Sequence, residues 1–244
     1  MSIHKTPSAY DALSIKRGGT GSVSGVDSRA WQVLQDTIWG CELCRQNERI
    51  ACNIRQQTEP PVRDVKLLLA GIAPPFVEGI VQKTPARSAT NNPDDNLRKR
   101  FILATLPASW EDLLTQGLFL IHSVKCAITV EDRHQNPPDK TVNDCAPPHF
   151  VQEIQLIQPS RVVVFGKAPY RAVLKIPGVK PPRSLGVSAR VGTLVDRTRG
   201  GLALQADAWK FCIHVSPFPF QGGKLNPLAQ EVLREAAKLA GLPH

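Results

Sequence analysis

The chain has 244 residues, enough for one substantial hydrophobic core, and its 42% apolar and 21% charged residues exclude a fully disordered protein. Thirty Lys and Arg residues against 21 Asp and Glu residues give a net charge of +9, which favours a polyanionic partner. Six cysteines are too few for a disulfide-stapled secreted domain, and neither an apolar signal segment nor an 18-residue apolar run is present, so we expect a cytoplasmic protein.

The N-terminal 27 residues are rich in Ser, Gly and Thr and predict a mobile arm, followed by one folded domain over residues 28–244. A helix is expected from Ser28, as N-cap, to Gly40. Short apolar runs predict four strands, at Lys66–Ala70, Gly117–Val124, Arg161–Phe165 and Trp209–Val215. Apolar residues at helical spacing predict helices between and after them, at Asn96–Leu106, Ser109–Gln116, Pro148–Ile157, Ala168–Lys175 and Asn226–Leu239.

Strands that alternate with helices predict a single-domain α/β fold, with a central, mostly parallel four-stranded sheet sandwiched between helices. Ligands of such sheets bind in the loops that leave the carboxyl ends of the strands. The loops of interest are therefore Gly71–Glu78, His122–Cys126 and His214–Gly223.

Four cysteines lie in three separate segments and can share one metal centre. Cys41 and Cys44 form a C-x2-C pair after the first helix, Cys126 ends the second predicted strand, and Cys145 follows a Pro-rich stretch. They can complete an iron–sulfur cluster or a tetrahedral zinc site, or can simply be buried. Cys52 is close enough in sequence to replace a distal ligand, whereas Cys212 lies within a strand and is expected in the core.

The order and spacing of these features resemble the iron–sulfur branch of the uracil-DNA glycosylase superfamily, families 4 and 5. The similarity covers roughly residues 30–239 and rests on five motifs: Cys41-x2-Cys44, Gly71-Ile-Ala-Pro74, Val124-Lys-Cys126, Cys145 before a helix, and His214-Val-Ser-Pro217. It implies that Cys41, Cys44, Cys126 and Cys145 hold a structural [4Fe–4S] cluster, with zinc as the alternative.

The resemblance also implies a mechanism in which a nucleotide is flipped out of DNA and its N-glycosidic bond is hydrolysed. His214, on the loop after the last strand, would stabilise negative charge on the departing base. Ser216 and Pro217 would press on a phosphate. Gly71, Ile72, Ala73, Pro74, Phe76 and Ser123 would line the pocket for the base.

Three departures from the family pattern affect the expected chemistry. Ile72 and Ala73 stand where many members carry an acidic residue that positions water, so Glu78 is a candidate substitute, although family 5 also has an aliphatic residue there. His122 stands where family 4 places an asparagine that recognises the pyrimidine, and an imidazole cannot present a donor and an acceptor to one edge as an amide does. Phe76 is the nearest aromatic for stacking, and we expect a roomier pocket that accepts a different or broader set of bases.

Most of the net charge is concentrated between Gly166 and Gly200, where eight basic residues face one acidic residue, a sum of +7. The Pro- and Gly-rich part, Pro177–Gly201, predicts an extended loop or hairpin. We expect Lys167, Arg183, Arg190 and Arg197 to contact DNA phosphates, against the alternative of a solvated basic surface.

The sequence therefore predicts a monofunctional DNA glycosylase of base-excision repair, monomeric, bacterial and nucleoid-associated. It would remove uracil or a related deaminated or modified base. The first alternative is a DNA-lesion-binding protein of the same fold with weak or no catalysis, and the second is a metal-bearing hydrolase that acts on nucleotides.

Overall fold

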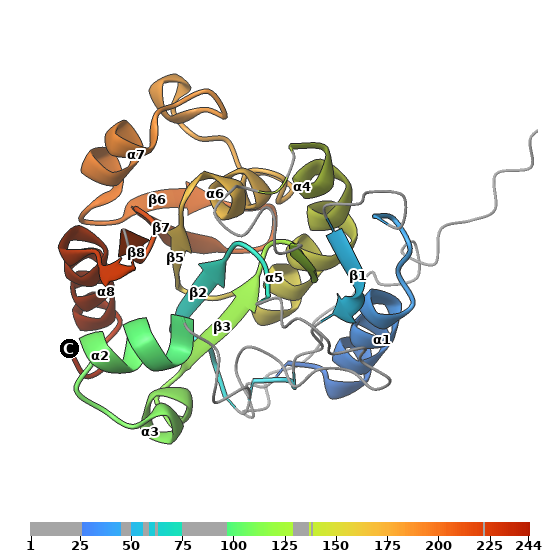
Figure 1. The fold of residues 1–244 in the computed structure, drawn as a ribbon, viewed down its shortest axis with the longest axis horizontal. Coiled ribbons are helices and arrows are strands. Elements are labelled where there is room, and N and C mark those ends of the chain that lie inside the picture. The colour runs from blue at the N-terminus through green and yellow to red at the C-terminus, as the bar shows by residue number, and fades with distance from the viewer. Residues whose placement is uncertain are drawn as a thin grey trace, which may run out of the picture.

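The computed structural model describes residues 26–44, 50–55, 59–61, 63–74, 97–128, 137, 139–221 and 223–244. A five-stranded sheet in the order β3-β2-β5-β7-β6 forms the centre (Figure 1). Its strands are β2 (Leu67–Gly71), β3 (Leu118–His122), β5 (Arg161–Phe165), β6 (Leu202–Gln205) and β7 (Lys210–Ser216). The first four in the order are parallel and β6 is antiparallel to β7. The predicted α/β class and four strands are confirmed, and β6 is an additional edge strand.

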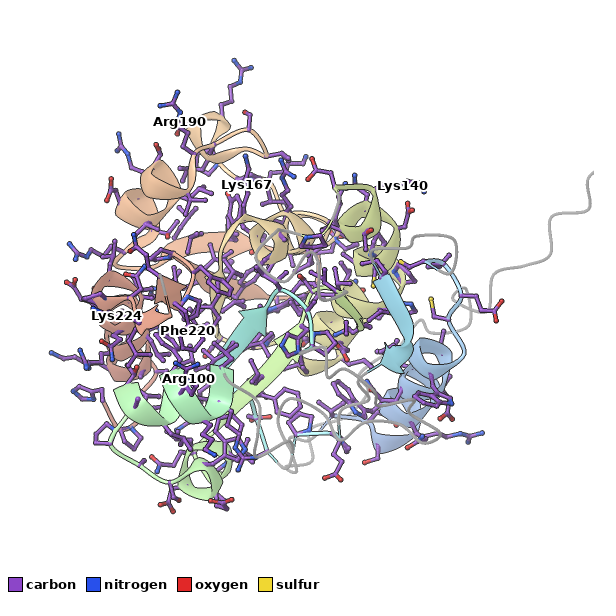
Figure 2. All side chains as sticks on the ribbon, viewed as in Figure 1. Arg100, Lys140, Lys167, Arg190, Phe220 and Lys224 are labelled. Atoms are coloured by element: carbon purple, nitrogen blue, oxygen red, sulfur yellow. The ribbon has the colours of Figure 1, made fainter. Side chains whose placement is uncertain are left out.

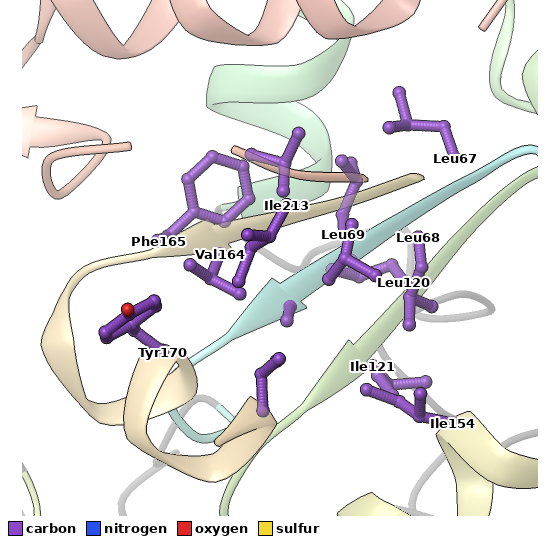
Figure 3. Packing of buried hydrophobic residues seen from close by; sticks show 14 of the residues in the cluster. Leu67, Leu68, Leu69, Leu120, Ile121, Ile154, Val164, Phe165, Tyr170 and Ile213 are labelled. Carbon is purple, nitrogen blue, oxygen red and sulfur yellow. The ribbon is translucent and has the colours of Figure 1, made fainter. Parts of the chain in front are cut away.

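Helices cover both faces of this sheet, which explains why its strands are continuous apolar runs. On one face Ile121 of β3 lies beside Ile154 of the helix Val151–Ile157 (α5), and on the other Phe165 of β5 points toward the segment that contains Phe101 (Figure 3). The rings of Phe101 and Phe165 meet edge to face, with centroids 5.5 Å apart. The core therefore lies on both sides of the central strands.

The helical segments are α1 (Ser28–Trp39), η2 (Leu97–Ile102), α2 (Leu103–Thr105), α3 (Trp110–Thr115), α4 (Asp139–Cys145), η4 (Ala146–Phe150), α5 (Val151–Ile157), α6 (Lys167–Val173), η5 (Arg183–Leu185), α7 (Val191–Thr198) and α8 (Pro227–Leu239). Of these, η2 and η4 are π-helical turns and η5 is a 3₁₀ turn. Within the described part of the chain, no helix combines the length and apolar character needed to cross a membrane.

Two sequence predictions about helices were wrong. Asp27, not Ser28, is the N-cap of α1, because its carboxylate accepts hydrogen bonds from the backbone N–H groups of Arg29 and Ala30 at 2.9 and 3.1 Å. The stretch expected as an extended loop, Pro177–Gly201, contains η5 and α7. By contrast, the predicted helix Ser109–Gln116 is confirmed as α3 with Ser109 as its N-cap, since the Ser109 hydroxyl accepts a hydrogen bond from the N–H of Asp112 at 3.1 Å.

Two small antiparallel sheets complete the fold. β1 (Ile50–Arg55) pairs with β4 (Cys126–Ile128), and β8 (Phe220–Gln221) pairs with β9 (Lys224–Leu225). The prediction that Cys126 ends the second long strand was wrong, because β3 ends at His122 and Cys126 begins β4. The predicted N-terminal arm lies outside the described residues, apart from its last two.

Candidate functional site

The carboxyl edge of the sheet brings Gly71 of β2 and His122 of β3 side by side as partners in the parallel ladder. A Cβ atom on residue 71 would lie 2.6 Å from Cδ2 and 2.9 Å from Nε2 of the His122 ring, closer than real Cβ contacts. Any residue other than glycine would therefore displace this imidazole. Glycine at position 71 is a packing requirement set by His122.

Hydrogen bonds fasten the two loops that follow these strands. The N–H groups of Ser123 and Val124 donate to the carbonyl oxygens of Gly71 and Ile72, each at 2.9 Å. The Ser123 hydroxyl also donates to the Ile72 carbonyl at 2.9 Å. The backbone around His122 is consequently held in one position, and the proton of the predicted pocket residue Ser123 is already engaged.

His122 is a buried, neutral polar group at this edge. Its residue exposure is 5%, and Nδ1 has no hydrogen-bond partner among the described residues. Burial, and secondly the positive charge of Lys125, lower the pKa of the imidazole to about 3. A buried polar atom without a partner is uncommon in folded proteins, so this nitrogen is a candidate to bond a ligand or water.

The carboxyl ends of β5 and β7 continue the same edge. Gly166, in a left-handed conformation (φ 91°), donates its N–H to the carbonyl of Ser216 at 2.9 Å. Ser216 is fully buried and its hydroxyl donates to the carbonyl of Pro217 at 2.9 Å. Phe218, two residues later, has 51% of its surface exposed. The sequence analysis did not identify Phe218 as a candidate, although it directly follows the Ser216-Pro217 pair.

The family model described as the uracil DNA glycosylase superfamily matches residues 59–234, which is most of the chain and includes the whole of this edge. The chain belongs to the uracil DNA glycosylase superfamily. No curated protein matches it. Membership in the superfamily indicates a DNA glycosylase-like function and DNA as the binding partner.

In this superfamily member, His214 does not lie on the loop after the last strand, as the sequence predicted. It lies inside β7, paired in register with Val163, and is fully buried. Its Nδ1 is 3.1 Å from the carbonyl oxygen of Arg199, and its Nε2 is 3.5 Å from Nη1 of Arg161. The predicted strand Trp209–Val215 already includes position 214, so the error was to assign His214 to the following loop.

These contacts determine which protons His214 can give. A carbonyl only accepts, so Nδ1 carries the proton that is donated to Arg199, and the neutral ring holds a lone pair at Nε2. Burial, and to a smaller extent the charge of Arg161, lower the pKa of His214, while the bond to Arg199 opposes this shift. In this arrangement the neutral ring has no second proton for a departing base, so the catalytic role of His214 stays a prediction.

Contacts connect the four predicted cysteine ligands. Cys44 and Cys126 belong to one small apolar cluster with Ile50 and Ile128, against which Ile72 and Ala73 also pack. Cys145 is close enough to Cys41 and Cys44 to interact with both electrostatically, and its sulfur accepts from the N–H of Lys125 at 3.5 Å. Burial raises the pKa of the Cys145 thiol to about 12. The three cysteine-bearing segments therefore converge beside Gly71–Pro74, called here the first motif.

Among the residues that the structure describes, no three His, Cys, Asp or Glu side chains are arranged to hold a single metal ion. Cys212, predicted in the core, lies half-buried in β7, and the Cys52 side chain lies outside the described part.

The basic residues between Gly166 and Gly200 differ in their partners. Arg171 and Arg199 form ion pairs with Asp139 and Glu231. Arg183, Arg190 and Arg197, called here the exposed arginine set, are exposed and make no ion pair with described residues. Figure 2 shows Arg190 on the outer side of the α7 region and Lys167 nearer the sheet; Lys167 is half-buried at the start of α6.

The remaining predicted pocket residues are only partly placed. Ile72 and Ala73 are half-buried and Pro74 is buried, directly after β2. Phe76 and Glu78 lie outside the described residues. The described part of the edge thus offers apolar walls and one unpartnered imidazole nitrogen, and its first motif carries no carboxylate at positions 72 and 73.

Proposed function

We propose that this protein is a DNA glycosylase that flips a damaged base into the edge formed by Gly71 and His122 and hydrolyses its N-glycosidic bond. The observation that carries this proposal is the buried Nδ1 of His122, which has no partner among the described residues and lies at the ligand-binding edge of a superfamily fold. A flipped base is planar and carries donors and acceptors along its edge, so it can complete the hydrogen bonding of this atom.

Neutral imidazole suits recognition of the departing base. Because the pKa of His122 is lowered to about 3, the ring is uncharged at neutral pH and offers one N–H and one lone pair. If the N–H is at Nδ1, it can donate to an oxygen of the base, where negative charge grows as the bond breaks. If the lone pair is there, Nδ1 can accept from a ring N–H. The preferred base would then be set by the tautomer that the pocket selects.

The chain's own residues favour water as the nucleophile over a lysine amine. Lys125 is the lysine of the Val124-Lys-Cys126 motif, and its ammonium is buried and ion-paired with Glu153. An amine in that state cannot attack a sugar carbon. Positions 72 and 73 supply no general base, so water would be positioned by groups outside these two residues. The protein would accordingly be a monofunctional hydrolase.

Two surface features would hold the DNA around the flipped nucleotide. Phe218 is exposed beside the Ser216–Pro217 turn and is a candidate wedge for the space that the base leaves, as apolar side chains inserted between base steps are in other DNA-binding proteins. The exposed arginine set, with Lys167, would neutralise phosphates and add affinity without sequence preference.

We also propose that Cys41, Cys44, Cys126 and Cys145 hold a [4Fe–4S] cluster. The four cysteines come from three converging segments, and three of them are buried. The cluster would cross-link these segments and would take no part in base excision. Absorbance near about 400 nm with roughly four irons per chain would support this assignment, whereas one zinc per chain and no such band would refute it.

A lesion-binding protein without hydrolysis is the second candidate, and the aliphatic pair Ile72 and Ala73 favours it. The test is a panel of duplexes that contain uracil, hypoxanthine or mispaired thymine, assayed both for binding and for abasic-site formation. The proposal predicts abasic sites from at least one duplex. Tight binding to a modified duplex with no abasic product from any of them would establish the second candidate instead.

A further inference from the structure

A buried ion pair joins the Val124-Lys-Cys126 motif to helix α5. The ammonium of Lys125 contacts the carboxylate of Glu153, and their side chains are 5% and 0% exposed. Removing two charges from water costs free energy that their attraction only partly offsets. A pair of well-packed apolar residues would give the fold equal or greater stability, so stability alone does not explain these charges.

The hydrogen bonds of the two charged groups show which segments the ion pair connects. Lys125 Nζ also donates to the carbonyl oxygen of His122 at 2.6 Å and lies 5.7 Å from the centroid of the Phe150 ring. The other carboxylate oxygen of Glu153 accepts from the side-chain amide of Gln35 in α1 at 3.1 Å. One network therefore fixes the turn from His122 to Cys126 against α1 and α5.

The same network is connected to the three segments that carry the four cysteines. Gln35 is on the helix that ends just before Cys41, and Glu153 is on the helical segment that follows Cys145. The backbone N–H of Lys125 donates to the Cys145 sulfur at 3.5 Å, and Cys126 is the next residue. Each segment that carries a cysteine is thus joined to this ion pair by one or two short links.

We propose that the Lys125–Glu153 ion pair is a positioning device that sets the His122 ring in the base pocket and the cysteine-bearing segments around their shared centre. The role of the ion pair in positioning the His122 ring rests on the proposed function. Its role in positioning the cysteine-bearing segments does not. A charged network has directional hydrogen bonds at fixed atoms, whereas apolar packing tolerates shifts of the turn. Specific polar contacts thereby select one arrangement of the turn.

The test separates position from stability with three variants, Lys125→Met, Glu153→Leu and the double variant. Each single variant leaves one buried charge unpaired, and its Tm should fall by about 10 °C. The double variant restores apolar packing and should recover most of this loss. The matched control is Lys140→Met, which removes an exposed ion pair with Asp144 near the same cysteines and should leave Tm unchanged.

Position is then measured in the double variant without using activity. Alkylation of Cys126 and Cys145 in the purified protein, quantified by mass spectrometry, should be faster by about tenfold than in the wild type. The NMR signals of the His122 ring, assigned by their loss in His122→Asn, should also shift. Wild-type alkylation rates and an unshifted His122 ring in the stable double variant would overturn the proposal, whatever base the protein excises.

Discussion

Replacing His122 by asparagine should make the protein less sensitive to acid, because it removes an imidazole that the fold keeps uncharged. The pKa of His122 falls from 6.5 to about 3 on folding. Between these values the unfolded chain binds a proton that the folded protein excludes. The contribution of the neutral His122 to the free energy of unfolding is therefore complete above about pH 6.5 and is lost as the pH falls toward 3.

The size of the effect follows from the shift. Each pH unit below the pKa of the unfolded chain lowers the free energy of unfolding by about 1.4 kcal/mol per group. The free energy of unfolding of wild type should therefore fall by about 2 kcal/mol between pH 7 and pH 5 through His122 alone. The pKa of His214 is lowered as well, and its contribution has the same sign. Because His214 is present in both proteins, the difference between wild type and His122→Asn isolates His122.

The assay is urea denaturation of both proteins at pH 7, 6 and 5, followed by circular dichroism with reversibility checked at each pH. The free energy of unfolding of wild type should fall by about 2 kcal/mol more than that of His122→Asn over this range. Parallel pH profiles would refute the reasoning, since they would mean that His122 is solvated or already partnered in the folded protein.

Three further predictions concern the site and its surface. Gly71→Ala places a methyl group 2.6 Å from the His122 ring and should slow base excision by about 10²-fold. The control Gly192→Ala, whose added methyl would have no atom within 4 Å, should keep the wild-type rate. Equal excision rates for the two variants would refute the packing argument. Replacing the exposed arginine set with glutamine should reduce the slope of log Kd for DNA against log salt by up to about 2.7, and an unchanged slope would remove these residues from the interface. Phe218→Ala should slow excision from paired duplex by about tenfold and leave single-stranded substrate nearly unaffected; equal losses on both would exclude a wedge.

The sequence predicted the sheet well because its central strands are buried on both faces. Leu67–Ala70 and Leu118–Ile121 are runs of large apolar residues, and a run of this kind can be identified without knowing its neighbours. Strand β6 was missed because only Leu204 is buried among its four residues, so it lacks the apolar run. Helix α7 was missed because the surrounding Pro and Gly residues favoured a loop.

The site was predicted less completely, because close approaches between distant segments leave little trace in sequence. The motif residues Gly71 and His122 were identified. That the His122 ring leaves no room for a Cβ atom on residue 71 can be seen only when β2 and β3 are paired in register. The hydrogen bond from His214 to the carbonyl oxygen of Arg199 depends on how the end of α7 packs against β7. The ion pair between Lys125 and Glu153 spans 28 residues and depends on the packing of α5.

The most direct test of the proposed function is single-turnover excision by wild type, His122→Ala, His214→Ala and the surface control His244→Ala. The duplex is the one whose base wild type releases fastest. If His122 contacts the departing base, His122→Ala should lower the rate by about 10²- to 10³-fold while His244→Ala retains it. A full rate in His122→Ala, with loss confined to His214→Ala, would contradict the assignment and return the catalytic role to His214.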